Sequence, residues 1–358
     1  MRVKSVYLEN VRGLPPIDLD FFDPVTEQIR TRTVIAGSNG SGKTTILDTI
    51  YTLMHLIVSR PEKPLGTWLM PSRVRARLEL HDMPTLSYPH PPYAVPAGWS
   101  LVVALGPEHW LSQIEAPYLI ALTGDAVNTW HFVRSDEPGS FISLDWPVKR
   151  EWMEAERPTT LYFPSEQREL AAKEKGQIIA ETREHAWVWR FSDSQKWEGS
   201  LESFIVALYA REHFPQPETP EEEEKAYPTF QEFLDVVNGF LTRKRITGVS
   251  RTTFRVQVVG ENGQKFSLDE LSSGEKQILL FLAEVQRRIS RGSLLLIDEP
   301  EIHLHPGWQA RLIDALTDLC RQYDAQMIVA THSEEVARSV YEHELILLDD
   351  VFGWRKGQ

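Results

Sequence analysis

The stretch Gly37-Ser38-Asn39-Gly40-Ser41-Gly42-Lys43-Thr44 decides the fold through what precedes and follows it. A short apolar run, Thr33–Ala36, comes immediately before it. After it, apolar residues recur at helical spacing, at Ile46, Leu47, Ile50, Leu53, Met54 and Ile57. The expected order is therefore a buried strand, a glycine-rich loop and a helix. In that context the glycines turn backbone N–H groups toward phosphate oxygens, and the helix dipole adds positive potential.

The loop predicts a nucleoside triphosphate, ATP, and Mg²⁺ as ligands. Lys43 is expected to reach the β- and γ-phosphates, and the Thr44 hydroxyl to bind the metal. The predicted nucleotide-binding residues of this segment are Ser38, Asn39, Gly40, Ser41, Gly42, Lys43, Thr44 and Thr45. A flexible Gly/Ser loop is the alternative, and it does not account for the flanking strand and helix.

Two adjacent carboxylates, Asp298 and Glu299, follow the apolar run Leu294–Ile297. Open α/β sheets bind ligands at the carboxyl ends of their strands, so we expect both carboxylates at the phosphate site. Asp298 is predicted to hold Mg²⁺ through its coordinated water. Glu299 is predicted to polarise the water that attacks the γ-phosphorus. Taken alone, the motif also fits an acidic turn after a strand.

Apolar strands alternate with helices along the last part of the chain. Strands are expected in residues 252–259, 264–268, 293–298, 325–331 and 344–349, and helices in residues 272–289, 306–323 and 333–341. Such alternation predicts an α/β fold with a parallel sheet covered by helices on both faces. Residues 60–245 are less regular, with strand-like runs at 101–105 and 159–163 and helical stretches near 166–184 and 200–213.

The segment Leu271-Ser272-Ser273-Gly274-Glu275 begins one of these helices. Here the chain resembles the ABC ATPase superfamily, whose signature loop, usually LSGGQ or LSGGE, contacts the γ-phosphate bound to the other subunit. The resemblance implies that Ser272, Ser273, Gly274 and Glu275 contact nucleotide. It also implies a P-loop NTPase fold of the ABC-head type, with a mixed or parallel sheet. A capping box of Ser272 and Glu275 is the other interpretation, and the two are compatible because such a helix start also needs a cap.

His332, in Thr331-His332-Ser333, resembles the switch histidine of the same superfamily, which contacts the γ-phosphate. The intervening stretch, residues 301–306, reads Glu-Ile-His-Leu-His-Pro. Histidines at alternate positions are one pattern of metal ligands, but no further Cys/His cluster supports a metal site here. In this position the stretch resembles the loop through which ABC heads touch each other.

Jointly, these motifs and Asn10-Val11-Arg12 resemble the AAA15/OLD and RecF-like branch, relatives of SMC and Rad50 heads. The resemblance covers about residues 1–58 and 252–350. It implies that Arg12 contacts adenine or phosphate. ABC heads also carry a glutamine loop that senses Mg²⁺, and Gln167 is the candidate, with Gln113 and Gln195 as alternatives.

We therefore expect three parts in the chain. Residues 1–58 form the first part of the ATPase head with the phosphate loop, residues 59–245 an inserted lobe of loops and helices, and residues 246–358 the rest of the head. The 358 residues can bury a sizeable core, and the 42% apolar and 25% charged residues are those of an ordinary globular protein. A single cysteine, Cys320, and the lack of a signal peptide or membrane-spanning run indicate a soluble cytoplasmic protein without membrane contact.

The resemblance implies an ATPase that closes as a homodimer around ATP and leaves open a higher oligomer. Relatives in this branch serve DNA repair and anti-phage defence, often beside a nuclease or toxin. We expect the defence role, with the nuclease or toxin as a separate effector protein. The alternatives are a transporter ATPase subunit, a non-catalytic scaffold that binds ATP and rarely turns it over, and a repair or recombination ATPase acting directly on DNA. The 228 residues between Lys43 and Leu271 are more than transporter heads place there.

Charge leaves nucleic-acid binding open. The net charge of −13 argues against a surface that is basic everywhere, and the acidic run Glu218–Glu224 is read as a solvated loop or a docking segment for a basic partner. Despite the negative net charge, the sequence contains two groups of basic residues. The first is Arg73, Arg75 and Arg77, and the second is Arg243, Lys244, Arg245, Arg251 and Arg255. Ordinary solvated charges are the preferred interpretation, and a groove for phosphates is the alternative.

Overall fold

The structure is a computed structural model. It describes residues 1–58, 67–84, 86–89, 92–95, 97–123, 130–134, 141–143, 158–165, 187–191, 201–213, 229–302 and 304–352. The predicted helix near residues 166–184 lies outside these residues. No helix in the described ranges is long and apolar enough to cross a membrane.

A six-stranded sheet positions the predicted phosphate loop. Its strands, in spatial order, are β14 (Val188–Arg190), β13 (Thr160–Phe163), β18 (Leu294–Asp298), β19 (Gln326–Thr331), β5 (Arg32–Ala36) and β20 (Leu345–Leu347). Every neighbouring pair is parallel. These strands are continuous apolar runs because helices cover both faces of the sheet. The predicted α/β fold is confirmed.

A second sheet has seven strands and is mixed. Its order is β12 (Phe141–Ser143), β11 (Trp130–Arg134), β10 (Tyr118–Leu122), β9 (Leu101–Leu105), β6 (Arg75–His81), β1 (Arg2–Glu9) and β2 (Ile17–Asp20). Only β9 and β10 pair in parallel among these strands. Strands β1 and β2 form an antiparallel hairpin, with Ser5 opposite Asp20 and Leu8 opposite Ile17.

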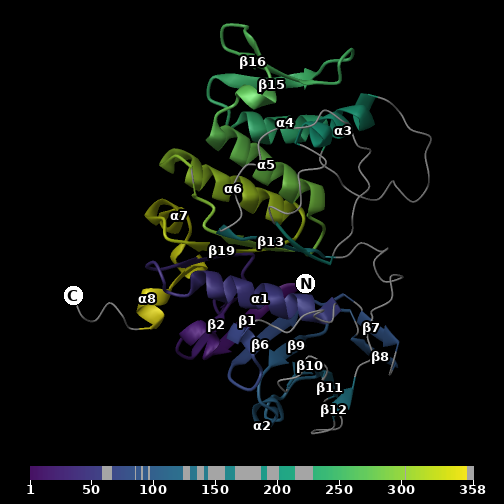
Figure 1. The fold of residues 1–358 in the computed structure, drawn as a ribbon, viewed down its shortest axis with the longest axis vertical. Coiled ribbons are helices and arrows are strands. Elements are labelled where there is room, and N and C mark those ends of the chain that lie inside the picture. The colour runs from purple at the N-terminus through teal and green to yellow at the C-terminus, as the bar shows by residue number, and fades with distance from the viewer. Residues whose placement is uncertain are drawn as a thin grey trace.

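Helix α1 (Lys43–Val58) lies between the two sheets, as Figure 1 shows. It contacts β18 and β19 of the parallel sheet and β6 and β9 of the mixed sheet. Its apolar side chains are therefore buried on opposite faces of the helix, and Ile46, Leu47, Ile50, Leu53 and Met54 are fully inaccessible to solvent. Because a helix buried all round must be apolar all round, the segment after Thr45 is rich in Ile, Leu and Met.

Further helices cover the other face of the parallel sheet (Figure 1). Helices α5 (Ser273–Arg288) and α6 (Pro306–Gln322) lie next to the sheet, and α3 (Leu201–His213) and α4 (Phe230–Asn238) pack against α5 farther from it. Alternation along β18 divides its side chains between two cores, with Leu294 and Leu296 on the α1 side and Leu295 and Ile297 on the α5–α6 side.

The described chain also contains shorter elements. They are α2 (Glu108–Leu111), α7 (Glu334–Arg338), α8 (Leu348–Val351) and the hairpins β3 (Phe22–Asp23) with β4 (Gln28–Ile29) and β7 (Leu86–Pro89) with β8 (Pro92–Val95). The strand expected at residues 344–349 is shorter than predicted, because Leu348 and Asp349 begin α8.

A three-stranded antiparallel sheet lies at the end of the molecule opposite β12 (Figure 1). It contains β15 (Lys244–Val249), β16 (Val256–Gly260) and β17 (Lys265–Phe266). The strands expected at residues 252–259 and 264–268 are both present and pair with each other, but the first begins only at Val256, because Arg251–Thr253 form a turn. The strand β15 was not expected from the sequence.

Strands from residues 59–245 belong to both large sheets. Strands β6 and β9–β12 extend the sheet that β1 and β2 begin, whereas β13 and β14 complete the parallel sheet. The segment expected to form an inserted lobe thus shares sheets with the segments on either side of it. The division of the chain into three parts stays a prediction.

Candidate phosphate-binding and hydrolysis site

The carboxyl ends of four parallel strands meet at the predicted phosphate loop. Ala36 at the end of β5 is opposite Thr331 of β19, and Ala330 is opposite Asp298 of β18. On the other side of β18, Ile297 is opposite Phe163 of β13. The loops after these strands therefore converge at one edge, where open α/β sheets place their ligands.

The glycine-rich loop joins β5 to α1 as predicted. Gly40 and Gly42 have φ angles of 80° and 94°, which glycine adopts without strain. The Lys43 ammonium donates to the carbonyl oxygens of Gly37 and Ser38, each at 2.9 Å. The Lys43 side chain therefore folds back across the loop, so its charge lies over the backbone that is expected to surround a phosphate.

The N-terminal turn packs directly against this loop. Gly42 packs against the buried Leu14 side chain, and its positive φ angle of 94° favours glycine at this position. Leu14 follows a turn in which Asn10 and Arg12 have positive φ angles of 60° and 49°. This turn thereby brings the predicted Arg12 close to the beginning of α1.

Asp298 joins the loop to the parallel sheet. The carboxylate is fully buried, and its Oδ2 atom accepts hydrogen bonds from the Thr44 hydroxyl at 2.8 Å and the Ser165 hydroxyl at 2.7 Å. A carboxylate and two hydroxyl groups are the hard oxygen donors that Mg²⁺ prefers. Because protein sites commonly hold Mg²⁺ through one or two carboxylates together with substrate phosphates, these residues fit the predicted metal.

Glu299 points away from its neighbour because of its backbone. Its φ angle is 50°, in the left-handed region, and its N–H group still donates to the Ala330 carbonyl at 2.7 Å. The carboxylate lies 3.2 Å from Nδ1 of His332, whose side chain is half-exposed. A non-glycine residue in this conformation costs on the order of 1–3 kcal/mol. This conformation separates the two adjacent carboxylates, so that Asp298 faces Thr44 and Glu299 faces His332.

Glu301, which sequence analysis did not select, organises the loop around His332. One oxygen, Oε1, accepts hydrogen bonds from the Thr331 hydroxyl at 2.5 Å, the His332 N–H at 3.0 Å and the Ser333 N–H at 3.1 Å. The side chain is buried, and the same oxygen lies 3.4 Å from Nδ1 of His332. The carboxylate therefore fixes both the backbone and the ring of the predicted switch residue.

Replacing Glu301 with alanine is expected to lower kcat for ATP hydrolysis by up to about 100-fold, because a misplacement of about 1 Å has an effect of this size. The KM for ATP should change little, since the phosphate loop is untouched. Steady-state ATPase assays on protein with a normal melting temperature test this. Glu301→Gln keeps an acceptor oxygen and should retain most of the activity. Equal activity of Glu301→Ala and wild type would refute the positioning role.

The signature-like segment begins α5, and its polar groups bond to one another. Ser272 is the N-cap, with its N–H group 2.7 Å from Glu275 Oε2, and its hydroxyl accepts from the Glu275 N–H at 3.3 Å. Lys244 of β15 lies 3.4 Å from the same carboxylate. The capping box is thus present. Among the described residues, no hydrogen bond joins Ser272 or Glu275 to residues 37–44.

Arg12 lies over the second turn of α1. Its guanidinium pairs with Asp48 at 2.8 Å and stacks on the Trp68 ring at 4.1 Å. Asp48 also accepts a hydrogen bond from the Tyr162 hydroxyl at 2.8 Å. Burial, followed by the nearby Asp48 charge, raises the pKa of Tyr162, so this hydroxyl stays protonated and continues to donate. The nucleotide contact predicted for Arg12 stays a prediction.

Asp349 of α8 contacts the first turn of the phosphate loop. Its Oδ1 atom accepts from the Ser38 hydroxyl at 2.9 Å, and its Oδ2 atom accepts from the Ser38 N–H at 3.2 Å. Asp349 was expected in the strand at residues 344–349 and had no predicted role. The contact ties the loop to the element that follows β20.

The remaining predicted residues divide into described and undescribed ones. Gln167 and Gln195 lie outside the described residues, and Gln113 is exposed in the turn after α2, which contacts the mixed sheet and not the parallel one. His303 also lies outside them, and His305 accepts from the Gly307 N–H through Nδ1. The described residues contain no cluster of three or more His, Cys, Asp or Glu side chains that suits a metal ion.

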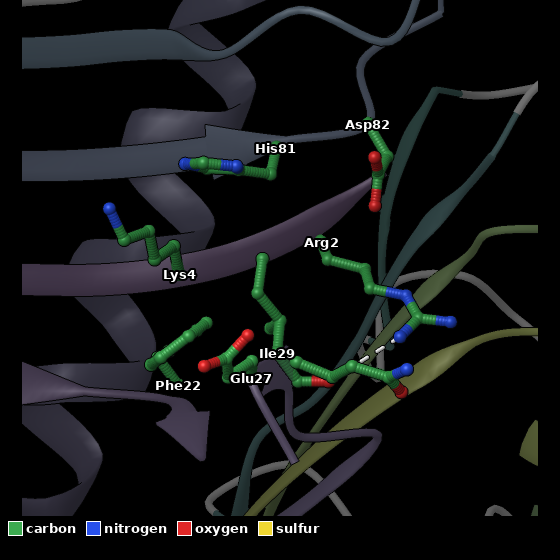
Figure 2. A pocket seen from close by; sticks show the side chains of 8 residues that line it. Arg2, Lys4, Phe22, Glu27, Ile29, His81 and Asp82 are labelled. Atoms are coloured by element: carbon green, nitrogen blue, oxygen red, sulfur yellow. Dashed lines mark hydrogen bonds between the residues drawn. The ribbon is translucent and has the colours of Figure 1, made fainter. Parts of the chain in front are cut away.

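A separate cavity of about 610 Å³ lies beside the first half of β1 (Figure 2). Its lining residues are Arg2, Lys4, Phe22, Glu27, Gln28, Ile29, His81 and Asp82. Arg2 donates to the Ile29 carbonyl and pairs with Asp324. Lys4 and His81 both contact Glu79, whose pKa falls to about 2, chiefly through its hydrogen bond to His81. Because these charges are already paired, the cavity does not resemble a second phosphate site.

Comparison with known proteins gives one family match. The model of the AAA_21 family, described as "AAA domain, putative AbiEii toxin, Type IV TA system", matches residues 146–338. That range contains the described residues Asp298, Glu299, Glu301 and His332, together with the start of α5.

Curated relatives match over shorter segments. A retron Ec83 probable ATPase of Escherichia coli is 33% identical over 102 residues, which cover 25% of this chain and 18% of that protein. The Septu protein PtuA of Bacillus thuringiensis is 31% identical over 117 residues, 29% of each chain. The matched segments thus span less than a third of these relatives. The SMC head domain from Thermotoga maritima has a TM-score of 0.40 and 16% identity, covering 95% of this chain and 92% of that one.

Proposed function

This chain belongs to the AAA_21 family of AAA domains, and we propose that it binds and hydrolyses ATP between two copies of itself. The observation that carries the proposal is the meeting of the phosphate loop with Asp298, Glu299 and His332 at one edge of the parallel sheet. A buried carboxylate bonded to the Thr44 hydroxyl and a second carboxylate beside a histidine are the parts that phosphoryl transfer to water needs.

Each residue then has one task. Lys43 would exchange its hydrogen bonds to the Gly37 and Ser38 carbonyls for phosphate oxygens, and the loop amides would surround the same phosphates. Mg²⁺ held by Thr44 and Asp298 would neutralise charge on the β- and γ-phosphates. Glu299 would polarise the attacking water, and His332 would contact the γ-phosphate while Glu301 holds its loop in place.

A second copy of the chain supplies the remaining residues of the nucleotide site. The capped start of α5 offers Ser272 and backbone N–H groups, which together suit an anion. Within one chain these groups have no hydrogen bond to residues 37–44 among the described residues. Placing them on the nucleotide of a partner copy, as the resemblance to ABC heads implies, gives each of the two sites residues from both chains.

We further propose that closing and opening of this dimer gates a separate effector, a nuclease or toxin, in cytoplasmic anti-phage defence. The similarity to a retron ATPase and a Septu protein supports this role, as does a family description that names a toxin–antitoxin system. Direct action on DNA is a second candidate. Exposed cations on the sheet of β15, β16 and β17 favour it.

A mixing experiment tests the shared site. Lys43→Ala removes the phosphate contact of one site. Ser272→Asp keeps a good helix N-cap but repels the γ-phosphate. Each variant alone should be inactive, and an equimolar mixture should recover about a quarter of wild-type ATPase activity. Random pairing gives about half mixed dimers, each with one intact site of two. Lack of recovery, with both variants folded, would overturn the shared site.

A further inference from the structure

The sheet formed by β15, β16 and β17 has one apolar and one polar face. Ile246, Val249, Val256 and Val258 are buried beneath it. Residues between them along the strands, including Arg245, Thr247 and Gln257, are exposed. In this sheet, alternation therefore places a polar surface toward solvent at the end of the molecule farthest from β12 (Figure 1).

Strand register gathers cations on the exposed face. Arg245 is opposite Val259 of β16, and Val259 is opposite Lys265 of β17, so Arg245 and Lys265 lie in one row across three strands. Two strand spacings separate them by roughly 10 Å. Arg243, two positions before Arg245, is also exposed and lies roughly 7 Å along the strand direction. The three residues Arg243, Arg245 and Lys265 are called the basic face below.

Among the described residues, no side chain neutralises the basic face. Arg243, Arg245 and Lys265 have no ion pair or side-chain hydrogen bond to any other residue in the described ranges. Residues 243–268 contain six Lys or Arg residues and one acidic residue, Glu261, in a chain whose net charge is −13. Solvated charges normally alternate in sign over a protein surface, so this local excess is informative.

The turn between β15 and β16 adds an aromatic residue and two further cations. Phe254 has a φ angle of 52° and is 40% exposed. Arg255 pairs with Glu202, and Arg251 donates to the Tyr209 hydroxyl at 3.4 Å, so α3 holds both ends of the turn. An exposed aromatic ring between arginines suits stacking on a base or sugar next to a phosphate.

We infer that the basic face and the Phe254 turn bind the sugar–phosphate backbone of nucleic acid. Complementary charge selects a polyanion, and the exposed ring favours a polyanion that carries bases over an acidic protein surface. This surface lies outside the ATP site, and the inference assigns residues to the second candidate function, direct action on DNA.

One residue links the basic face to the start of α5, the segment that the proposed function places on the nucleotide of a partner copy. Lys244, between Arg243 and Arg245 in sequence, points to the other side of β15 and donates to the Glu270 carbonyl at 2.9 Å, beside Glu275 at the start of α5. A ligand that binds Arg243 and Arg245 therefore contacts the two residues on either side of Lys244, which itself contacts the signature-like segment. Any coupling between the two rests on the proposed function, so the binding test is made without nucleotide.

Fluorescence anisotropy with a labelled duplex DNA of about two helical turns, at 50 to 200 mM salt, tests the inference. The triple variant Arg243→Gln, Arg245→Gln, Lys265→Gln should bind at least about tenfold more weakly at the lower salt concentration. Its slope of log K against log salt should be shallower by about 2 to 3, since each lost phosphate contact removes about 0.9. Labelled single-stranded DNA and duplex RNA show which form is preferred.

A control variant removes the same number of positive charges from other surfaces of the protein. The triple variant Arg291→Gln, Arg321→Gln, Arg338→Gln removes three exposed cations from other surfaces and should bind DNA as wild type does. Equal loss in both triple variants would show a general charge effect and overturn the inference. It is also overturned if wild type binds no nucleic acid, or if labelled poly-glutamate binds more tightly than every nucleic acid tested.

Discussion

Glu299→Gln is expected to slow ATP hydrolysis by about 100-fold or more, the size of effect that general-base catalysis supplies. The amide cannot polarise water as the carboxylate does, yet it preserves the size of the side chain and its hydrogen-bonding reach to His332. ATP should still bind, because the phosphate loop and Asp298 are unchanged. Single-turnover assays separate the chemical step from binding and product release.

The same variant should accumulate as an ATP-bound dimer. If hydrolysis opens the dimer, blocking hydrolysis leaves it closed, and light scattering coupled to size-exclusion chromatography with ATP and Mg²⁺ should show twice the monomer mass. Glu335→Gln, an exposed change at the start of α7, is the control and should behave as wild type. Full turnover by Glu299→Gln would reject the role given to Glu299.

Lys43→Ala is expected to weaken ATP binding by at least about 100-fold, since it removes a desolvated charge that faces the phosphates. Lys43 is buried, and its ammonium lies 2.9 Å from each of two loop carbonyls, so its charge is held at the loop. Binding of a fluorescent ATP analogue measures the loss directly. Comparing the loss of affinity for ATP with the loss of affinity for ADP shows how much of the loss depends on the γ-phosphate.

Lys4→Ala is the control for this second prediction. Lys4 is a half-buried lysine of β1 that pairs with Glu79 beside the separate cavity (Figure 2). Its loss should leave ATP affinity within about twofold, because an ion pair at a protein surface contributes only about 0–1 kcal/mol to stability. Tight ATP binding by Lys43→Ala protein would contradict the phosphate contact, whatever the control shows.

Local sequence patterns determined the central parts of the fold and site. The order of strand, glycine-rich loop and helix at residues 33–58 could be read directly, because helical spacing and glycine placement act over a few neighbouring residues. The same holds for Asp298 and Glu299 at the end of an apolar strand and for the capped start of α5 at Ser272. The structure brings Thr44, Asp298, Glu299 and His332 to one edge as the strand–helix order required.

Tertiary structure alone decided which other residues complete the site. Ser165, just after β13, reaches Asp298 across 133 residues of sequence, and Asp349 reaches Ser38 across 311 residues. Glu301 is close to His332 only because β18 and β19 are neighbours in register. Such contacts depend on strand order and register, which local patterns do not encode.

The same limit applies to the middle of the chain. Its apolar runs were visible in the sequence, but nothing local assigns β13 to the parallel sheet and β9 to the mixed one. The basic face depends on both the local sequence and the tertiary structure. The sequence supplied the cations at Arg243 and Arg245, and only the register of three strands placed Lys265 beside them and turned Lys244 to the opposite side. Sequence thus determined the elements and their chemistry, whereas pairing between distant strands determined which side chains share a surface.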